Sequence, residues 1–443
     1  MPELERQDER LFAPIARAGR GFWLLAVVAG GLGLAGLAAW LVQLRRGLAV
    51  TGLNVPVYWG LYITHFVFFI GISHAGTLIS AILRLSRAEW RRPITRAAEV
   101  ITVLVLFFGM GCVLLDLGRP DRAAFVLLHA NFRSPLLWDV ASVTTYLTAS
   151  TLYLYLPLIP DIALLRDRFP GRRWLYGPLS LRWTGTPRQH RILERAISVM
   201  AIVVIPIAVS VHTVVSWVFA MTVQPMWHST IFGPYFVVGA IFSGIAAIIL
   251  AMAVVRRAYR LEAYLKPVHF NNLGLLLLVM SLLWFYFTFA EFLTTWYGGD
   301  PSHLAVFVSK TEGRFALSFW TMVIACFVIP VALLASRRTR ATVWGTVVAS
   351  ISVEVGMWLE RFLIVVPSLS VPRLPMTAAP YAPSWVEWSL FAAFVALFVF
   401  LYAIFTKLFP IVSIWEVREG RERSVAEVSR RVESYLPAEE RAP

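Results

Sequence analysis

Long apolar runs dominate the hydrophobic pattern of the chain. About ten runs of roughly 18 or more mostly apolar residues occur along its 443 residues, and each is long enough to cross a lipid bilayer as a helix. The runs lie near residues 21–42, 56–84, 98–117, 135–160, 196–219, 231–255, 271–297, 315–336, 342–366 and 385–409. The pattern predicts an all-α integral membrane protein with about ten transmembrane helices.

The polar connections between these runs predict the orientation of the chain. Of the 40 lysines and arginines, 31 fall in one set of alternate connections, which includes both termini, and 9 fall in the other set. Cytoplasmic loops of membrane proteins carry the excess of positive charge. We therefore expect a multi-pass protein of the bacterial inner membrane with both termini in the cytoplasm. The charged C-terminal tail is expected to be a solvated helix or disordered, with docking of a partner as an alternative.

Composition narrows the class of protein. Hydrophobic residues make up 58% of the chain, charged residues only 15%, and the mean hydropathy is +0.69, which excludes an ordinary soluble protein. The net charge of +14 belongs to cationic loops and does not indicate nucleic-acid binding. Cys112 and Cys326 both lie in apolar runs and are too few to build an iron–sulfur or zinc site. We expect no metal or covalent cofactor in this chain.

A weak internal repeat relates the second and sixth apolar runs. Both contain two glycines five positions apart, Gly71 and Gly76 in the second run and Gly239 and Gly244 in the sixth. Four runs separate the two copies, so both would cross in the same direction and form a parallel repeat. Small residues at helix interfaces, common in any bundle, are the alternative explanation.

Several titratable residues gather at the depth of the predicted outer face. His65 lies in the outer third of its run, Asp116 ends the third run, and Asp139 lies about one turn inside the fourth. His129 stands in the outer loop between them, as does Arg119, which could instead pair with Asp116 at the helix end. A carboxylate inside a span needs a partner or a proton, so Asp139 and Asp116 are the candidate catalytic bases.

His74 lies deeper, in the inner half of the second run, where the repeat has Phe242. It is either a packing histidine bonded to the backbone or a proton-relay group, with Ser73, Thr77 and Ser80 as stepping stones. Further residues are candidates for proton transfer: Glu99 at the inner start of the third run, Glu291 in the outer half of the seventh, and Glu354 in the middle of the ninth.

Acids and imidazoles at one membrane face fit the oxidation of a quinol. That reaction releases two electrons and two protons, and a carboxylate or imidazole must accept each proton as a general base. An apolar cleft with few polar groups suits a ring with a long tail. The electrons would leave through redox centres that this chain lacks, so a partner protein with such centres is expected.

The order of several motifs resembles a known family. The stretches "TGLNVPVYWGLYITHFVFFIGISHAGTLISAILRL", "LDLGRPDR", "NFRSPLLWD", "WHSTIFGPYFVVGAIFSG" and "WLERFLIVVPSL" together resemble the polysulfide reductase membrane-subunit (NrfD-type) family. Within it, the chain looks most like the ten-span quinol-oxidising subunit of alternative complex III. An aspartate at position 116, before "LGRP", matches the wider family, whereas a histidine is expected there in the complex III subunits.

The resemblance implies a quinone site at the outer end of the first of two four-helix bundles. It assigns Asp116 and Asp139 to this site directly and places His65 at about the right depth to contact the quinone. His129 and Arg119 complete the candidate quinone-binding group, and the substrate would be menaquinol or ubiquinol. The implied organisation is a cytoplasmic segment (1–20), a flanking helix and loop (21–55), a first bundle (56–219), a second bundle (220–366), a last flanking helix (367–409) and a cytoplasmic tail (410–443).

The resemblance also implies partners. An iron–sulfur subunit, which could also carry a molybdopterin-like cofactor, would cover the outer face, with c-type haem subunits and a sibling membrane subunit alongside. The complex would be respiratory or photosynthetic, with proton translocation as a further expectation.

Other functions stay open at this point. The chain could itself be the sibling subunit, or the quinone-reactive anchor of a polysulfide reductase-like molybdoenzyme or hydrogenase. A dihaem membrane cytochrome would need paired histidines, such as His65 with His212. A secondary transporter would show helices broken at the midplane in both repeats.

Overall fold

The computed structural model describes residues 9, 11–371 and 379–422. The predicted cytoplasmic segment 1–20 and tail 410–443 therefore lie partly outside the described residues. The described chain is helical throughout, with no strand in these ranges. The predicted all-α membrane architecture is confirmed.

Nine of the described helices are long and apolar enough to cross a membrane. They are α2 (Arg20–Arg46), α3 (Leu61–Leu85), α4 (Thr95–Asp116), α6 (Pro135–Arg168), α8 (Pro187–Ala220), α9 (Phe232–Ala258), α10 (Pro267–Gly298), the broken helix Ala316–Leu334 and α16 (Trp385–Leu408). The broken helix consists of α12 (Ala316–Val323), a π-helical turn (Ile324–Val328) and α13 (Ile329–Leu334). The remaining predicted run is α15 (Val343–Ser370), whose charged residues Glu354, Glu360 and Arg361 lower its apolar character.

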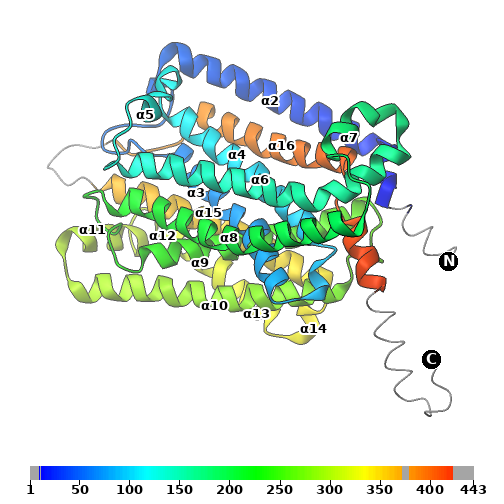
Figure 1. The fold of residues 1–443 in the computed structure, drawn as a ribbon. Helices are drawn as coiled ribbons and strands as arrows, with labels where there is room; N and C mark the ends of the chain where they lie inside the picture. Colours follow the sequence, from blue (N-terminus) through cyan, green and yellow to red (C-terminus); the bar gives the residue numbers. More distant parts are fainter. Residues whose placement is uncertain (1–8, 10, 372–378, 423–443) are drawn as a thin grey trace, which may run out of the picture.

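Short helices connect the long ones. These are α5 (Phe125–Leu128), α7 (Arg173–Leu179), α11 (Pro301–Thr311) and α14 (Arg337–Arg340). Helices α5 and α11 lie at one end of the molecule and α7 at the other (Figure 1). We call the end with α5 and α11 the outer end, following the predicted orientation, and the opposite end the inner end.

Local sequence explains where several long helices begin. Thr186 caps α8 in a reciprocal arrangement with Gln189, and Ser384 caps α16 in the same way with Glu387. Ser134 occupies the N-cap position of α6 and Pro135 its first turn, although the Ser134 side chain makes no capping bond.

The long helices contact one another in two rings. Helix α3 packs on α4 and α8, and α6 completes the first ring by packing on the same two helices. Helices α9, α10, α13 and α15 close a second ring in the same way, and α3 and α9 pack together between the rings. Helices α2 and α16 pair beside α4 (Figure 1). The residue boundaries of the two bundles remain a prediction.

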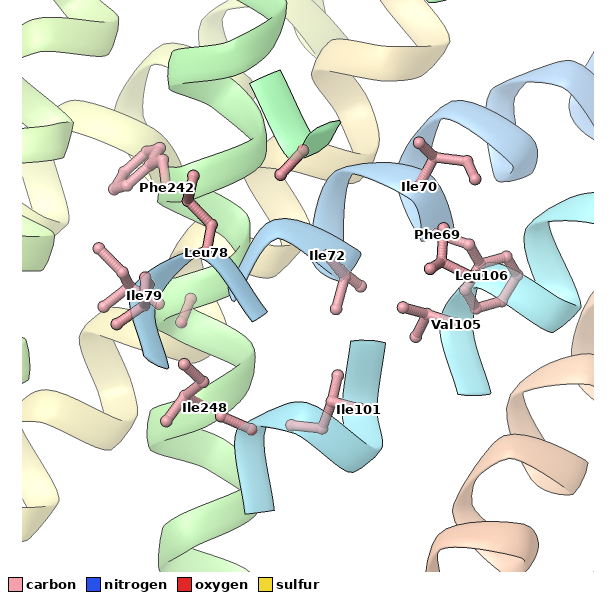
Figure 2. Packing of buried hydrophobic residues seen from close by; sticks show 14 of the residues in the cluster. Phe69, Ile70, Ile72, Leu78, Ile79, Ile101, Val105, Leu106, Phe242 and Ile248 are labelled. Carbon is pink, nitrogen blue, oxygen red and sulfur yellow. The ribbon is translucent and has the colours of Figure 1, made fainter. Parts of the chain in front are cut away.

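The core lies where α3, α4 and α9 meet. Phe69 lies beside Leu106 of α4, and Leu78 lies beside Phe242 of α9 (Figure 2). At Gly76, a Cβ atom would lie 1.9 Å from the carbonyl oxygen of Ala98, so only glycine allows the backbones of α3 and α4 to come this close. This glycine of the repeat therefore has a packing role.

Candidate functional site

Asp116 ends α4 beside a hydrogen-bonded cluster at the outer end. Its Oδ1 is buried and has no hydrogen-bond partner among the described residues. Tyr62 on α3 and Glu387 on α16 are its electrostatic neighbours. Tyr62 donates to Gln43 Oε1 at 2.5 Å, and Gln43 Nε2 donates to the carbonyl of Leu115 at 2.7 Å. The neighbouring groups are thus held in place while one oxygen of Asp116 is left available.

His65 lies on the α16 side of α3. Its ring stacks on Phe391 with centroids 3.7 Å apart, and its Nε2 is buried and lacks a partner within the described chain. An apolar cavity of about 280 Å³ runs beside this region between α2, α4 and α16, and Leu115 and Phe394 are among its lining residues. Leu115 directly precedes Asp116, so this apolar groove lies next to the last turn of α4.

Asp139 lies about one turn inside α6, and its side chain points towards the interior of the first ring of helices. Tyr146 and Tyr153 follow it at intervals of seven residues, which places all three on one face of the helix. Both tyrosines are buried, and Asp139 Oδ1 is buried with no partner in the described ranges. No hydrogen bond or ion pair between described residues joins Asp139 to Asp116, so the two aspartates stand at the same end as separate acceptors.

The structure does not bring Arg119 and His129 into the buried group. Arg119 is exposed and forms an ion pair with Asp121 at 3.0 Å rather than with Asp116. The hydrogen bond from Arg119 lowers the pKa of Asp121 below its ordinary value. His129 is exposed on the outer surface, edge-on to Phe125. Of the candidate quinone-binding residues, these two lie at the surface.

His74 faces His212 inside the protein. The two ring centroids are 3.7 Å apart, and His74 Nε2 lies 2.7 Å from the carbonyl oxygen of Ala208. His74 Nδ1 and both ring nitrogens of His212 have no partner among the described residues. The sequence offers His212 and His65 as a haem pair, but the structure directs His65 to Phe391 and His212 to His74. His65 and His212 therefore face different neighbours, which excludes them as a pair of haem ligands.

Arg361 enters the interface between the two rings from α15. It forms an ion pair with Glu360 at 2.5 Å, and its guanidinium lies 5.3 Å from the ring centroid of Phe236. A Cβ atom at Gly239 would be 2.8 Å from Arg361 Nη2, whereas one at Gly71 would be 3.6 Å away. Gly71 and Gly239, the first glycine of each repeat copy, thus lie on either side of Arg361. The repeat pattern in the sequence does not reveal this relationship.

Polar side chains continue from the histidine pair towards the inner end, and we call them the polar column. The column consists of His74, Ser73, Thr77 and Ser80 on α3, Glu99 on α4, and Tyr146, Ser150 and Tyr153 on α6. Tyr146 Oη donates to the carbonyl of Ser73 at 3.0 Å. Thr77 Oγ1 donates to Ser150 Oγ at 3.2 Å.

The column ends at Glu99. Ser80, about one turn beyond Thr77, donates to Glu99 Oε1 at 2.7 Å and lies 3.4 Å from the hydroxyl of Tyr153. Glu99 is buried inside the first ring. Thr77 with Ser150 and Ser80 with Glu99 thus form two polar groups inside the first ring, and no hydrogen bond between described residues joins them. The Ser73 hydroxyl donates to the carbonyl of Ile70 on its own helix.

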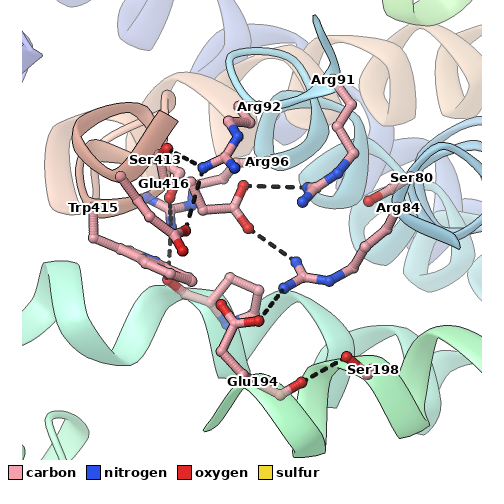
Figure 3. A network of polar contacts seen from close by, with 12 residues as sticks. Ser80, Arg84, Arg91, Arg92, Arg96, Glu194, Ser198, Ser413, Trp415 and Glu416 are labelled. Carbon is pink, nitrogen blue, oxygen red and sulfur yellow. Dashed lines mark hydrogen bonds and ion pairs between the residues drawn. The ribbon is translucent and has the colours of Figure 1, made fainter. Parts of the chain in front are cut away.

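The segment after α16 closes the inner end of this ring. Glu416 accepts from Arg84 at 2.9 Å and from Arg91 at 3.3 Å (Figure 3). Asp161 is bound to Arg96 at 2.5 Å and accepts from the backbone N–H of Trp415 at 3.1 Å. The expectation of a solvated tail from Glu416 onwards is therefore wrong for Glu416, which is buried against Arg84 and Arg91. Its acidic side chain fits the basic inner end of the bundle.

A second group of charges lies at the outer end of the second ring. Glu291 accepts from Ser229 at 2.5 Å, and it lines a cavity of about 30 Å³ with Lys310 and Glu360. That volume has room for about two water molecules. Burial lowers the pKa of Lys310, on α11, to about 8. Glu354 lies apart from this cavity, and neither of its oxygens has a partner in the described chain.

One known protein family matches most of this chain. The model of the polysulphide reductase NrfD family matches residues 49–373, which is most of the chain. The chain belongs to the NrfD family. The matched region contains both rings of helices, together with Asp116, Asp139 and the polar column. The family predicted from the sequence motifs is confirmed.

Several NrfD relatives are named as parts of reductases or oxidoreductases. A selenate reductase subunit of Mesobacillus selenatarsenatis is 23% identical over 86% of this chain and 92% of its own. The Hdr-like menaquinol oxidoreductase integral membrane subunit of Archaeoglobus fulgidus is 22% identical over 92% of this chain and 96% of its own. A protein of Halobacterium salinarum, provisionally named as a membrane subunit of dimethyl sulfoxide reductase, is 31% identical over 48% of this chain. The match spans about half the length of that last relative (47%).

Proposed function

We propose that this NrfD protein is the quinone-reactive membrane subunit of a multisubunit electron-transfer complex. It would oxidise a quinol at the outer end of the first ring and pass electrons to a partner subunit. Family membership supports this proposal, as does the Archaeoglobus fulgidus relative that is named as a menaquinol oxidoreductase subunit. Menaquinol is therefore the first substrate to test, followed by ubiquinol.

The observation that carries the proposal is the pair of available carboxylate oxygens at the outer end. Asp139 Oδ1 and Asp116 Oδ1 are both buried and both lack a partner among the described residues. Burying an unpaired carboxylate is costly, and a quinol hydroxyl would supply the missing donor. Each carboxylate can then take a proton as the ring is oxidised.

The surroundings of Asp116 suit a lipid-soluble substrate. The apolar groove beside Leu115 gives a path from the bilayer, and His65 Nε2 offers a second hydrogen-bonding position near the same end. The hydrogen bonds that fix Tyr62 and Gln43 keep these residues from competing for the Asp116 carboxylate.

The polar column would carry protons between the outer site and the inner end. Its hydroxyl groups and the carboxyl of Glu99 can each accept and donate a proton. His74 and His212 stand between Asp139 and the hydroxyl groups, at the level of Tyr146. Glu291 and Glu354 are not joined to the column by any hydrogen bond between described residues, so we assign them no step in this route.

The electrons require a partner because quinol oxidation releases two of them. We propose an iron–sulfur subunit on the outer face, where Phe132 and Leu128 are exposed beside His129. Haem-bearing and sibling membrane subunits would complete a complex of the inner membrane. In the proposed orientation, both termini are cytoplasmic.

Two of the relatives also support a second kind of complex. The selenate reductase and dimethyl sulfoxide reductase relatives support a role as the quinone-reactive anchor of a terminal reductase. The membrane chemistry would be the same, and the two assemblies differ in the partner. Haem analysis of the co-purified complex separates them, because haem-bearing subunits are proposed for the first assembly only.

The proposal is tested by replacing Asp139 with asparagine. Loss of the base should lower quinol turnover by at least about tenfold without changing assembly. Asp121→Asn is the matched control, because Asp121 is exposed at the same end and pairs only locally with Arg119. Turnover of the Asp139→Asn complex close to that of the unmodified complex would remove Asp139 from the site.

A further inference from the structure

A large cavity lies at the inner end of the molecule, far from the proposed quinone site. It has a volume of about 560 Å³ and lies between residues 13–25, the last turns of α9 and the last turns of α16. Three membrane-spanning helices begin or end there, since α2 starts at Arg20, α9 ends at Ala258 and α16 ends at Leu408. The cavity therefore crosses the boundary between the hydrocarbon layer and the inner headgroup region.

The cavity has one basic end. Arg17, Arg260 and Lys407 line it, and none of its described lining residues is acidic. Lys407 is held in place because its Nζ donates to the carbonyl oxygens of Pro14 and Arg17, each at 2.9 Å. A fixed positive field without a compensating carboxylate favours an anion at this end.

The other end of the cavity is apolar. Phe22 and Leu25 of α2 face Val254 of α9 and Val399 of α16 across it. These positions lie inside the spans, at a depth that acyl chains occupy. A ligand that fills the whole cavity must therefore join an anionic group to a hydrocarbon chain.

We propose that this cavity binds one anionic phospholipid of the inner leaflet. Its phosphate would lie between Arg17 and Arg260, and one acyl chain would follow Phe22 and Val399. Basic pockets between transmembrane helices on the cytoplasmic side are suited to anionic headgroups. The lipid would tie the start of α2 to the ends of α9 and α16, which belong to different parts of the fold.

The test compares two lipids on the purified full-length chain. Native mass spectrometry counts retained dioleoylphosphatidylglycerol and dioleoylphosphatidylcholine after delipidation and titration. We expect the unmodified chain to retain phosphatidylglycerol with at least tenfold higher affinity. Equal retention of the two lipids would overturn the proposal.

Variants locate the site. The double substitution Arg17→Gln/Arg260→Gln should lower the affinity for phosphatidylglycerol at least tenfold and leave that for phosphatidylcholine unchanged. Arg257→Gln is the matched control, because Arg257 is exposed on the last turn of α9 and does not line the cavity. An equal loss in Arg257→Gln would mean that the net charge of this end binds the lipid.

A filling substitution tests the cavity itself. Ala258→Phe keeps all the charges and should displace the tightly bound lipid. Retention of phosphatidylglycerol in Ala258→Phe would contradict the proposal. Displacement of the lipid by millimolar inorganic phosphate would also contradict it, because a free anion would then suffice. Melting temperatures in lipid-free detergent identify any variant that fails to fold, and Gly21→Phe then replaces Ala258→Phe, since Gly21 lines the same cavity with open space at its Cβ.

Discussion

The imidazole rings of His74 and His212 lie with their centroids 3.7 Å apart, inside the protein and next to the interface between the two rings of helices. Two positive charges so close together in a medium of low polarity repel strongly, so the pair can hold at most one additional proton. His74 Nε2 is engaged with the carbonyl of Ala208, which leaves its Nδ1 and the His212 nitrogens for exchange. This arrangement suits a relay better than simple packing.

Replacing His74 with glutamine tests the relay. Glutamine can still donate to the Ala208 carbonyl but does not titrate near neutral pH. We expect the assembled variant to show roughly tenfold slower proton-coupled turnover and an altered pH profile. His190→Gln is the control, because His190 lies near the inner end against Trp183, away from the column. Unchanged proton stoichiometry and pH profile in His74→Gln would make His74 a structural residue.

The two glycines beside Arg361 should respond differently to alanine. At Gly239 the new Cβ would meet Arg361 Nη2 at 2.8 Å, and overpacking of this kind costs about 1–3 kcal/mol. At Gly71 the nearest atom would be 3.5 Å away, and alanine favours a helix over glycine by about 0.5–1 kcal/mol. Thermal unfolding in detergent should therefore show Gly239→Ala destabilised and Gly71→Ala unchanged or stabilised. Equal melting temperatures for the two variants would argue against Arg361 occupying this interface.

The buried ion pair between Asp161 and Arg96 should be essential for stability. Both side chains are almost fully buried, and removing one charge leaves the other uncompensated at a cost of about 3–5 kcal/mol. Asp161→Asn should therefore lower the free energy of unfolding by about this amount and release residues 410–422 to proteases. Asp167→Asn, which breaks an exposed pair with Arg166, should cost about 0–1 kcal/mol. Similar protease resistance in both variants would contradict this role of Asp161.

The orientation of the chain is open to a direct test. Reporter fusions at Arg91 and Arg173 should be cytoplasmic and a fusion at Asp121 external, because the inner connections carry most of the positive charge. Activity of a reporter that works only outside the cytoplasm, compared with one that works only inside, decides each position. A cytoplasmic Asp121 would invert the proposed inner and outer ends.

The sequence predicts the spans well because lipid imposes a simple rule on them. Each apolar run predicted from the sequence corresponds to a helix among the described residues, including α15, whose charges reduce its hydropathy. Ser73, Thr77 and Ser80 can be proposed as stepping stones because helical spacing places them near His74. The hydrogen bonds of Thr77 to Ser150 on α6 and of Ser80 to Glu99 on α4 need the neighbouring helices, which the sequence does not order in space.

The relationships that the sequence misses are between distant helices. His212 has the depth of His74, but only the packing of α3 on α8 brings the rings together. In the same way, Arg361 lies between Gly71 and Gly239 only because α15 packs beside the helices that carry these glycines. Glu416 belongs to a charged segment that is typical of a solvated tail, and its role follows from the arginines it meets at the inner end. A comparison of polar residues that lie at the same depth in different spans could have identified the histidine pair.

The central claim is that quinol binds at the outer end of the first ring of helices. A photoreactive menaquinone analogue, added to the full-length chain in its complex and followed by peptide mapping, tests this claim most directly. We predict saturable labelling of the outer thirds of α3, α4 and α6, including the peptides that contain Asp116 and Asp139, with protection by excess menaquinol. Labelling confined to α9–α15, or labelling that menaquinol does not protect, would contradict it.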